Sequence, residues 1–247
     1  MIDPAFQPHI WDYVLVAFFA LAMPLWMAAH TLPRIRALSP AQQEELRPRI
    51  YISAMISHWM MAAAALSPLF IGSASMTTLG LGFPLEFVPN LGLALALVFV
   101  VGLFIYMQRR RVMAMPDGRA LVRDAIRRFD WILPRTRRQR TLWVFVSIHA
   151  GVCEEMFFRG FLLAMLNHTL PFWMAAIVAS VLFGVGHMYQ GVRGMIGTTV
   201  VGAIMIGLYV LSGSLWVSML AHAVYDMHGG EFGRWALQDD EPGHTAA

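Results

Sequence analysis

Long apolar segments, each near the length that crosses a lipid bilayer, recur along this sequence of 247 residues and limit what it can fold into. A membrane-spanning helix needs about 20 predominantly apolar residues. Hydrophobic residues make up 58% of the chain and charged residues only 13%, roughly half the charged share of a soluble domain. We therefore predict an all-α integral membrane protein, a polytopic helix bundle with a single domain over residues 1–247.

Seven of the apolar segments are predicted to be transmembrane helices. One amphipathic helix is predicted in addition at residues 119–133, where apolar residues recur at helical spacing with arginines between them. We expect this helix to lie on the inner membrane surface; the alternative is a solvated connector. The predicted spans are residues 10–30, 50–72, 91–107, 141–166, 172–189, 195–211 and 215–228.

The distribution of arginine predicts how the chain is oriented. The loop after the first predicted span holds four arginines and the loop after the third holds eleven, whereas residues 73–90 hold none. Loops rich in arginine stay in the cytoplasm. We therefore expect the N-terminus outside and the C-terminus in the cytoplasm. All 18 basic residues are arginine, which hints at a bacterial source and hence at the bacterial inner membrane.

Several other classes of protein and site are disfavoured. The net charge of +3 is small, and the arginines gather in loops instead of forming the basic face that nucleic acid binding needs. Cys153 is the single cysteine, so an internal disulfide and a cysteine-based metal cluster are excluded. His30, His58 and His149 lack matching partners, and we interpret them as packing or interfacial residues.

The fourth predicted span contains three charged residues, although a charge near the bilayer centre costs at least ~2.5–3.5 kcal/mol. Glu155 and Arg159 are four residues apart, so they share a helix face and can pair. Glu154 is rotated by about 100° from Glu155, so it points elsewhere and lacks a partner on its own helix. Such a carboxylate can act as a general base. Alternatively, both glutamates form only ion pairs between helices.

Two further predicted spans carry polar residues one helical turn apart. Phe183 and His187 share a face of the fifth span, and His222 and Asp226 share a face of the seventh. Asp226 could orient His222, or both could point donors at a substrate carbonyl. The alternatives are a packing histidine and a helix-capping cluster. Ionisable groups on three helices favour one shared site, in a cavity open to the cytoplasm.

These three motifs together resemble the family of CAAX prenyl endopeptidases and bacteriocin-processing enzymes, also called the CPBP or Abi family. The pattern of that family is Glu-Glu-x-x-x-Arg, then Phe-x-x-x-His, then His-x-x-x-Asn or Asp, on successive membrane helices. All three motifs occur here in that order, within a predicted catalytic core at residues 141–228. The first three predicted spans lie outside the resemblance.

The resemblance implies a CAAX-type intramembrane protease. Glu154 and His187 are implied to activate the attacking water. His222 and Asp226 are implied to stabilise the tetrahedral oxyanion or to help hold a metal. The residues implied to have supporting roles are Glu155, Arg159 and Phe183.

Cofactor and substrate stay open at this point. A water activated by Glu and His is chemically sufficient, so no cofactor is required in the favoured interpretation. The alternative is a metalloendopeptidase, with zinc held by Glu154, His187 and His222. The expected partners are the lipid bilayer and a membrane-anchored peptide or protein substrate, with no nucleic acid. The rival hypotheses are a non-catalytic membrane scaffold and a proton or metal-ion carrier, because the same polar cluster could bind helices together or relay ions.

Overall fold

A computed structural model describes residues 6–82 and 88–238, and within these ranges the chain is helical with no strand, as predicted. Wide π-helical turns at Ala17–Ala22, Met27–Thr31 and Met156–Leu162 join successive α-helices into longer ones. The α-helices are α1 (Ile10–Val16), α2 (Met23–Trp26), α3 (Leu32–Arg36), α4 (Pro40–Phe70), α5 (Val88–Ala114), α6 (Gly118–Ile126), α7 (Arg137–Glu155), α8 (Leu163–Thr169), α9 (Phe172–Gly186), α10 (Gly191–Ser212) and α11 (Leu215–Leu237).

Among the described residues, five helices are long and apolar enough to cross a membrane: Ile10–Arg36, Pro40–Phe70, Leu91–Ala114, Arg137–Thr169 and Met188–Ser212. They overlap the first, second, third, fourth and sixth predicted spans. The predicted count of seven is not confirmed. The fifth predicted span corresponds to α9, an apolar helix of 15 residues. The seventh corresponds to α11, whose 23 residues include several polar side chains that lower its hydropathy.

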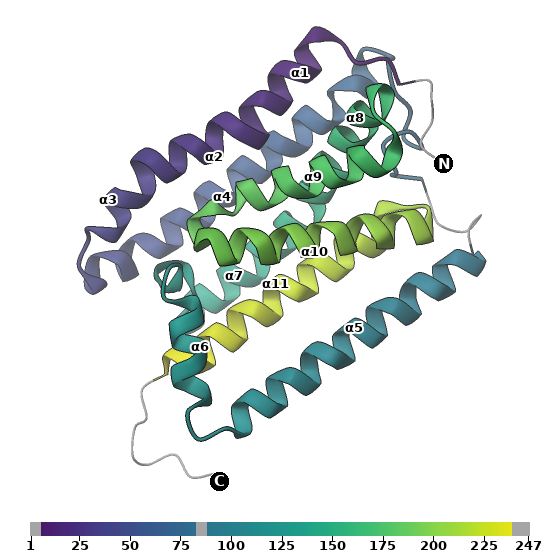
Figure 1. The fold of residues 1–247 in the computed structure, drawn as a ribbon. Coiled ribbons are helices and arrows are strands. Elements are labelled where there is room, and N and C mark those ends of the chain that lie inside the picture. The colour runs from purple at the N-terminus through teal and green to yellow at the C-terminus, as the bar shows by residue number, and fades with distance from the viewer. Residues whose placement is uncertain (1–5, 83–87, 239–247) are drawn as a thin grey trace.

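The helices form one bundle (Figure 1), in which the segment α1–α3 lies beside α4 on one side and α5 lies along the other. Helix α7 packs against both α4 and α11, and α10 packs against α9, α5 and α11. The approach of α7 to α11 requires Gly151, because a Cβ atom there would lie 2.7 Å from the carbonyl oxygen of Met219. The bundle therefore holds α7, which carries the two glutamates, between helices from both ends of the chain.

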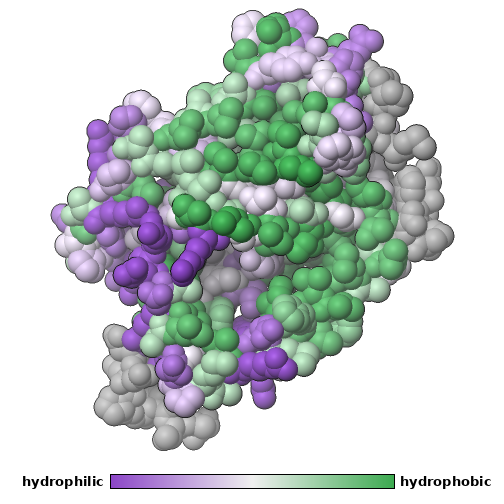
Figure 2. All heavy atoms as spheres, viewed as in Figure 1, coloured by the Kyte–Doolittle hydropathy of each residue, from purple (hydrophilic) through white to green (hydrophobic). Residues whose placement is uncertain are grey.

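Apolar side chains cover much of the outside of the bundle. Trp173 and Ile177 on α9 and Ile196 and Val200 on α10 are all exposed, and the face in Figure 2 is mostly hydrophobic over these helices. Hydrophilic side chains gather instead around α6 and the loop that follows it. This distribution fits a protein embedded in lipid, with one polar end near α6.

The predicted amphipathic helix is present but shorter than residues 119–133. Helix α6 ends at Ile126, and a short 3₁₀ turn follows at Asp130–Ile132. Val122 and Ile126 are buried in a cluster with Leu133 and Ala236, because α11 continues nine residues past the predicted end of the seventh span and offers a surface to them. Part of this apolar face therefore packs on α11, whereas Leu121 is 57% exposed; that the helix lies on the inner membrane surface stays a prediction.

The chain breaks between α9 and α10, next to a predicted site residue. Helix α9 ends at Gly186, His187 follows in a non-helical conformation, and Met188–Gln190 forms a 3₁₀ turn. Gly191 then has φ +81°, a conformation that favours glycine, and starts α10. His187 therefore lies in the turn between α9 and α10, directly after the last residue of α9.

Candidate active site

Two adjacent glutamates at the end of α7 face different partners. Glu155 is fully buried, and its Oε1 lies 2.9 Å from Nη1 of Arg159, so the predicted pair between them is confirmed. The same oxygen accepts a hydrogen bond of 2.8 Å from Nδ1 of His222 on α11. Glu155 therefore links two motifs: it pairs with Arg159 on its own helix and fixes the orientation of the His222 ring.

Glu154 points to a different side and meets a residue from α4. Its Oε1 lies 3.1 Å from Nε2 of His58, and each of the two side chains is 12% exposed. Its Oε2 lies 3.9 Å from Nε2 of His222 and has no hydrogen-bond partner among the described residues. The interpretation of His58 as a packing or interfacial residue is therefore wrong. The cost of a polar side chain inside the predicted span 50–72 was the signal that could have identified it.

Phe183 on α9 lies among the polar groups of all three motifs. The centre of its ring is 4.1 Å from the guanidinium carbon of Arg159, 4.8 Å from the ring of His187 and 5.7 Å from the ring of His222. A guanidinium over an aromatic face is attracted by the ring quadrupole. Arg159 also donates to the carbonyl oxygen of Gly202 on α10 at 3.3 Å. The Phe183 ring thus packs against both histidines and Arg159, and Arg159 links this cluster to α10.

His187 is held by the backbone of its own helix. Its Nδ1 lies 2.9 Å from the carbonyl oxygen of Phe183, and a carbonyl oxygen can only accept, so Nδ1 carries the proton. In the neutral ring this leaves Nε2 as an acceptor. His187 is also close enough to interact electrostatically with both Glu154 and Asp226. The side chain can therefore accept a hydrogen bond from a water molecule near these carboxylates.

Asp226 lies one turn after His222 on α11. Its Oδ2 is 3.7 Å from Nε2 of His222, and its side chain is 32% exposed. Its backbone carbonyl accepts a 3.0 Å hydrogen bond from the indole of Trp143 on α7. The ring of His222 is thus set by Glu155 at Nδ1, with Asp226 near Nε2. The structure brings together all seven predicted site residues: Glu154, Glu155, Arg159, Phe183, His187, His222 and Asp226.

The alternative of a zinc site finds no support in this arrangement. Among the described residues, no group of three or more His, Cys, Asp or Glu side chains is arranged to hold a metal ion. The prediction of a metalloendopeptidase is therefore not supported.

Comparison with known proteins agrees with the motifs. A family model described as type II CAAX prenyl endopeptidase Rce1-like matches residues 136–228, the part of the chain that contains α7, α9 and the first half of α11. No curated protein and no solved structure matches the chain. The match supports a role as a protease in general and, with the apolar helices, identifies an integral membrane protein. The segment that carries the three motifs is therefore similar to the Rce1-like type II CAAX prenyl endopeptidases.

Proposed function

We propose that this protein is an intramembrane endopeptidase that hydrolyses a peptide bond of a membrane-associated or lipidated peptide or protein. The observation that carries the proposal is the convergence of two carboxylates and two imidazoles from α7, α9 and α11 on one region: Glu154 Oε2 faces Nε2 of His222 at 3.9 Å, with His187 and Asp226 in electrostatic range. Groups that accept a proton and groups that stabilise an anion are what amide hydrolysis requires.

The proposed reaction begins with water between Glu154 and His187. Oε2 of Glu154 takes one proton from the water, while Nε2 of His187 accepts a hydrogen bond from the O–H that remains. The oxygen then attacks the carbonyl carbon, a C–O bond forms, and the carbonyl electrons move to the oxygen. Glu154 finally passes its proton to the departing nitrogen as the C–N bond breaks. The base is reused, and only water and the peptide bond are consumed.

The developing oxyanion needs donors, and α11 supplies them in this proposal. Nδ1–H of His222 is already donated to Glu155, which leaves a protonated Nε2 free to point its N–H at the oxyanion. Asp226 stands 3.7 Å from that nitrogen, so its carboxylate can help to hold the His222 ring in this orientation. An ionised Asp226 cannot donate a hydrogen bond itself, so it acts through His222.

Cleavage of membrane-anchored peptides tests the proposal. Wild-type protein in liposomes is offered a library of lipidated and unlipidated anchored peptides, and new termini are identified by mass spectrometry. In heavy-oxygen water, the new carboxylate gains label only if water attacks the carbonyl. We expect cleavage by the wild type and a rate about 10²–10⁴-fold lower in Glu154→Gln. The absence of cleavage across the whole library would contradict the proposal; ion flux lost in Glu154→Gln would then favour a carrier.

We also propose how the protein is oriented in the membrane. The end of the bundle near α6 carries the arginine-rich loop; His187 directly follows the last residue of α9, and Asp226 lies midway along α11, whose C-terminal part packs on α6. By the distribution of arginine this end faces the cytoplasm, so the site opens there. Cysteine-scanning labelling of the loop between α6 and α7 from either side of the membrane tests this assignment.

A further inference from the structure

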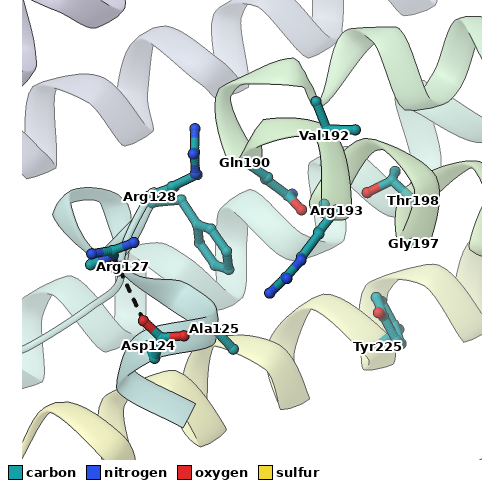
Figure 3. Close-up of a pocket in the computed structure, with 12 residues that line it drawn as sticks. Asp124, Ala125, Arg127, Arg128, Gln190, Val192, Arg193, Gly197, Thr198 and Tyr225 are labelled. Atoms are coloured by element: carbon teal, nitrogen blue, oxygen red, sulfur yellow. Dashed lines mark ion pairs between the residues drawn. The ribbon is translucent and has the colours of Figure 1, made fainter. Parts of the chain in front are cut away.

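A basic pocket of about 790 Å³ lies at the arginine-rich end of the bundle, outside the residues assigned to catalysis. Its walls come from three places in the chain (Figure 3): the loop after α6 with Arg127 and Arg128, the first turn of α10 with Arg193, and Tyr225 on α11. Arg193 points into the space between these elements, Arg128 lies beside the start of α10, and Arg127 is turned toward Asp124. The pocket therefore combines segments that are far apart in the sequence.

The charges around this pocket are not balanced. Its single carboxylate, Asp124, lies 3.9 Å from Nε of Arg127. No hydrogen bond or ion pair is formed by the guanidinium groups of Arg128 and Arg193 in the part of the chain that the structure describes. Three guanidinium groups and one carboxylate leave a net positive charge, so the pocket favours an anion.

Hydrogen bonds connect the loop after α6, which carries Arg128, with the turn that directly precedes α10, the helix that carries Arg193. Nη2 of Arg36, on α3, donates to the carbonyl oxygens of both Arg128 and Tyr189, at 3.0 and 3.1 Å. Gly191 lets the Arg128 side chain cross the start of α10, because a Cβ atom there would lie 2.6 Å from Cδ of Arg128. These contacts fix where Arg128 stands, so the pocket is formed before any anion arrives.

The position of the pocket points to a lipid. It lies at the start of the candidate span Met188–Ser212, which is the level of the headgroups in a bilayer. Val192 lines the pocket and is 71% exposed. Ile196 and Val200 follow at intervals of four residues, 62% and 55% exposed, so an apolar stripe runs from the pocket along α10.

We propose that this pocket binds the phosphate group of an anionic phospholipid, with an acyl chain along the stripe of Val192, Ile196 and Val200. Guanidinium groups bind phosphate oxygens through paired hydrogen bonds, and basic pockets at the ends of membrane helices favour anionic headgroups. The bound lipid would contact the loop after α6, α10 and α11 at once and so hold these three elements together.

Occupancy of the pocket is expected to act on the proposed active site, in a step that depends on the proposed function. Tyr189, whose carbonyl is held by Arg36, has its ring 5.9 Å from that of His187. Tyr225, on the opposite wall, directly precedes Asp226. A lipid that holds these walls together restrains two site residues, so anionic lipid raises the rate of cleavage.

Lipid retention tests the binding without relying on activity. The full-length protein is reconstituted in vesicles of phosphatidylcholine alone or mixed with phosphatidylglycerol, and the lipid retained after extraction is counted by native mass spectrometry. The paired variant Arg128→Gln with Arg193→Gln removes two pocket charges. The matched control, Arg137→Gln with Arg138→Gln, removes the same charge from exposed positions outside the pocket. We expect retention of phosphatidylglycerol to fall roughly fivefold per arginine removed from the pocket, and to be unchanged in the control.

Each other result contradicts the proposal in a different way. Equal loss in both paired variants would mean diffuse attraction to the membrane. Displacement of phosphatidylglycerol by inorganic phosphate would mean a site for a free anion. Unchanged retention with a higher KM in phosphatidylcholine vesicles would mean that the arginines bind the substrate instead. If the pocket variant loses phosphatidylglycerol but no preparation cleaves peptide, lipid binding stands and the proposed function fails.

Discussion

Nε2 of His58 lies 3.1 Å from Oε1 of Glu154, so α4, outside the segment of residues 136–228 that matches the family model, contributes a contact to the proposed general base. This contact occupies one carboxylate oxygen and leaves the other directed at His222, 3.9 Å away. The N-terminal helices, for which the sequence suggested no role, thus take part in the site through the packing of α4 on α7.

Removal of the His58 side-chain donor is predicted to lower kcat without raising KM. A hydrogen bond to a charged group contributes about 1.5–3 kcal/mol, so His58→Leu is expected to lower kcat roughly tenfold to a hundredfold. His58→Gln keeps an N–H near the position of Nε2 and is expected to restore most of the rate. Rates and KM on a cleaved peptide check this.

His149→Leu is the control for that series, because the half-buried His149 bonds to the carbonyl of Phe145 on its own helix and packs its ring against Trp59 on α4. Wild-type kcat in His58→Leu would show that Glu154 does not need this contact. Equal rates in His58→Leu and His58→Gln would assign the loss to packing.

Substitution of the two glutamates of α7 is predicted to have different effects, a lower rate of cleavage for Glu154 and a lower stability for Glu155. Glu154→Gln is expected to fold normally and to lose about 10²–10⁴-fold in rate, the usual contribution of a general base. Glu155→Gln leaves the buried Arg159 without its counter-ion, which costs about 3–5 kcal/mol of stability. Thermal unfolding in detergent, measured beside cleavage, separates the two effects. A destabilised Glu154→Gln with full activity would reverse the assignment.

Asp226 is predicted to tolerate asparagine better than leucine. Asparagine keeps a polar group near Nε2 of His222, 3.7 Å away in the wild type, and its amide can donate directly to an oxyanion. Asp226→Asn is therefore expected to retain activity within about tenfold, whereas Asp226→Leu loses 10²-fold or more, of the order seen for a lost oxyanion donor. Steady-state rates decide this, and similar rates in both variants would remove Asp226 from the mechanism.

The contact of α7 with α11 is predicted to depend on Gly151. In Gly151→Ala the new methyl group would lie 2.7 Å from a carbonyl oxygen of α11, so the helices must separate, at a cost of about 1–3 kcal/mol. Gly207→Ala is the control, because no atom lies within 4 Å of a Cβ there. Unfolding temperatures in detergent compare the two, and equal stability would mean that α7 and α11 can move apart without cost.

The sequence by itself determined the features that depend only on the geometry of a single helix. Apolar segments of membrane-spanning length specify helices, and a spacing of four residues places Glu155 beside Arg159 on one helix face, whatever the rest of the chain does. The three motifs indicated the family whose model matches residues 136–228, and they supplied the seven predicted site residues, which the structure brings together.

Only the tertiary structure decided which helices meet. The contact of His58 with Glu154 joins residues 96 positions apart, and the hydrogen bond of His222 to Glu155 joins residues 67 apart. Neither follows from helical periodicity, because each depends on how two separate helices pack. The same reason explains α6, whose apolar face fits a membrane surface equally well by pattern. It packs on α11 because that helix extends to Leu237 and presents Ala236 to it.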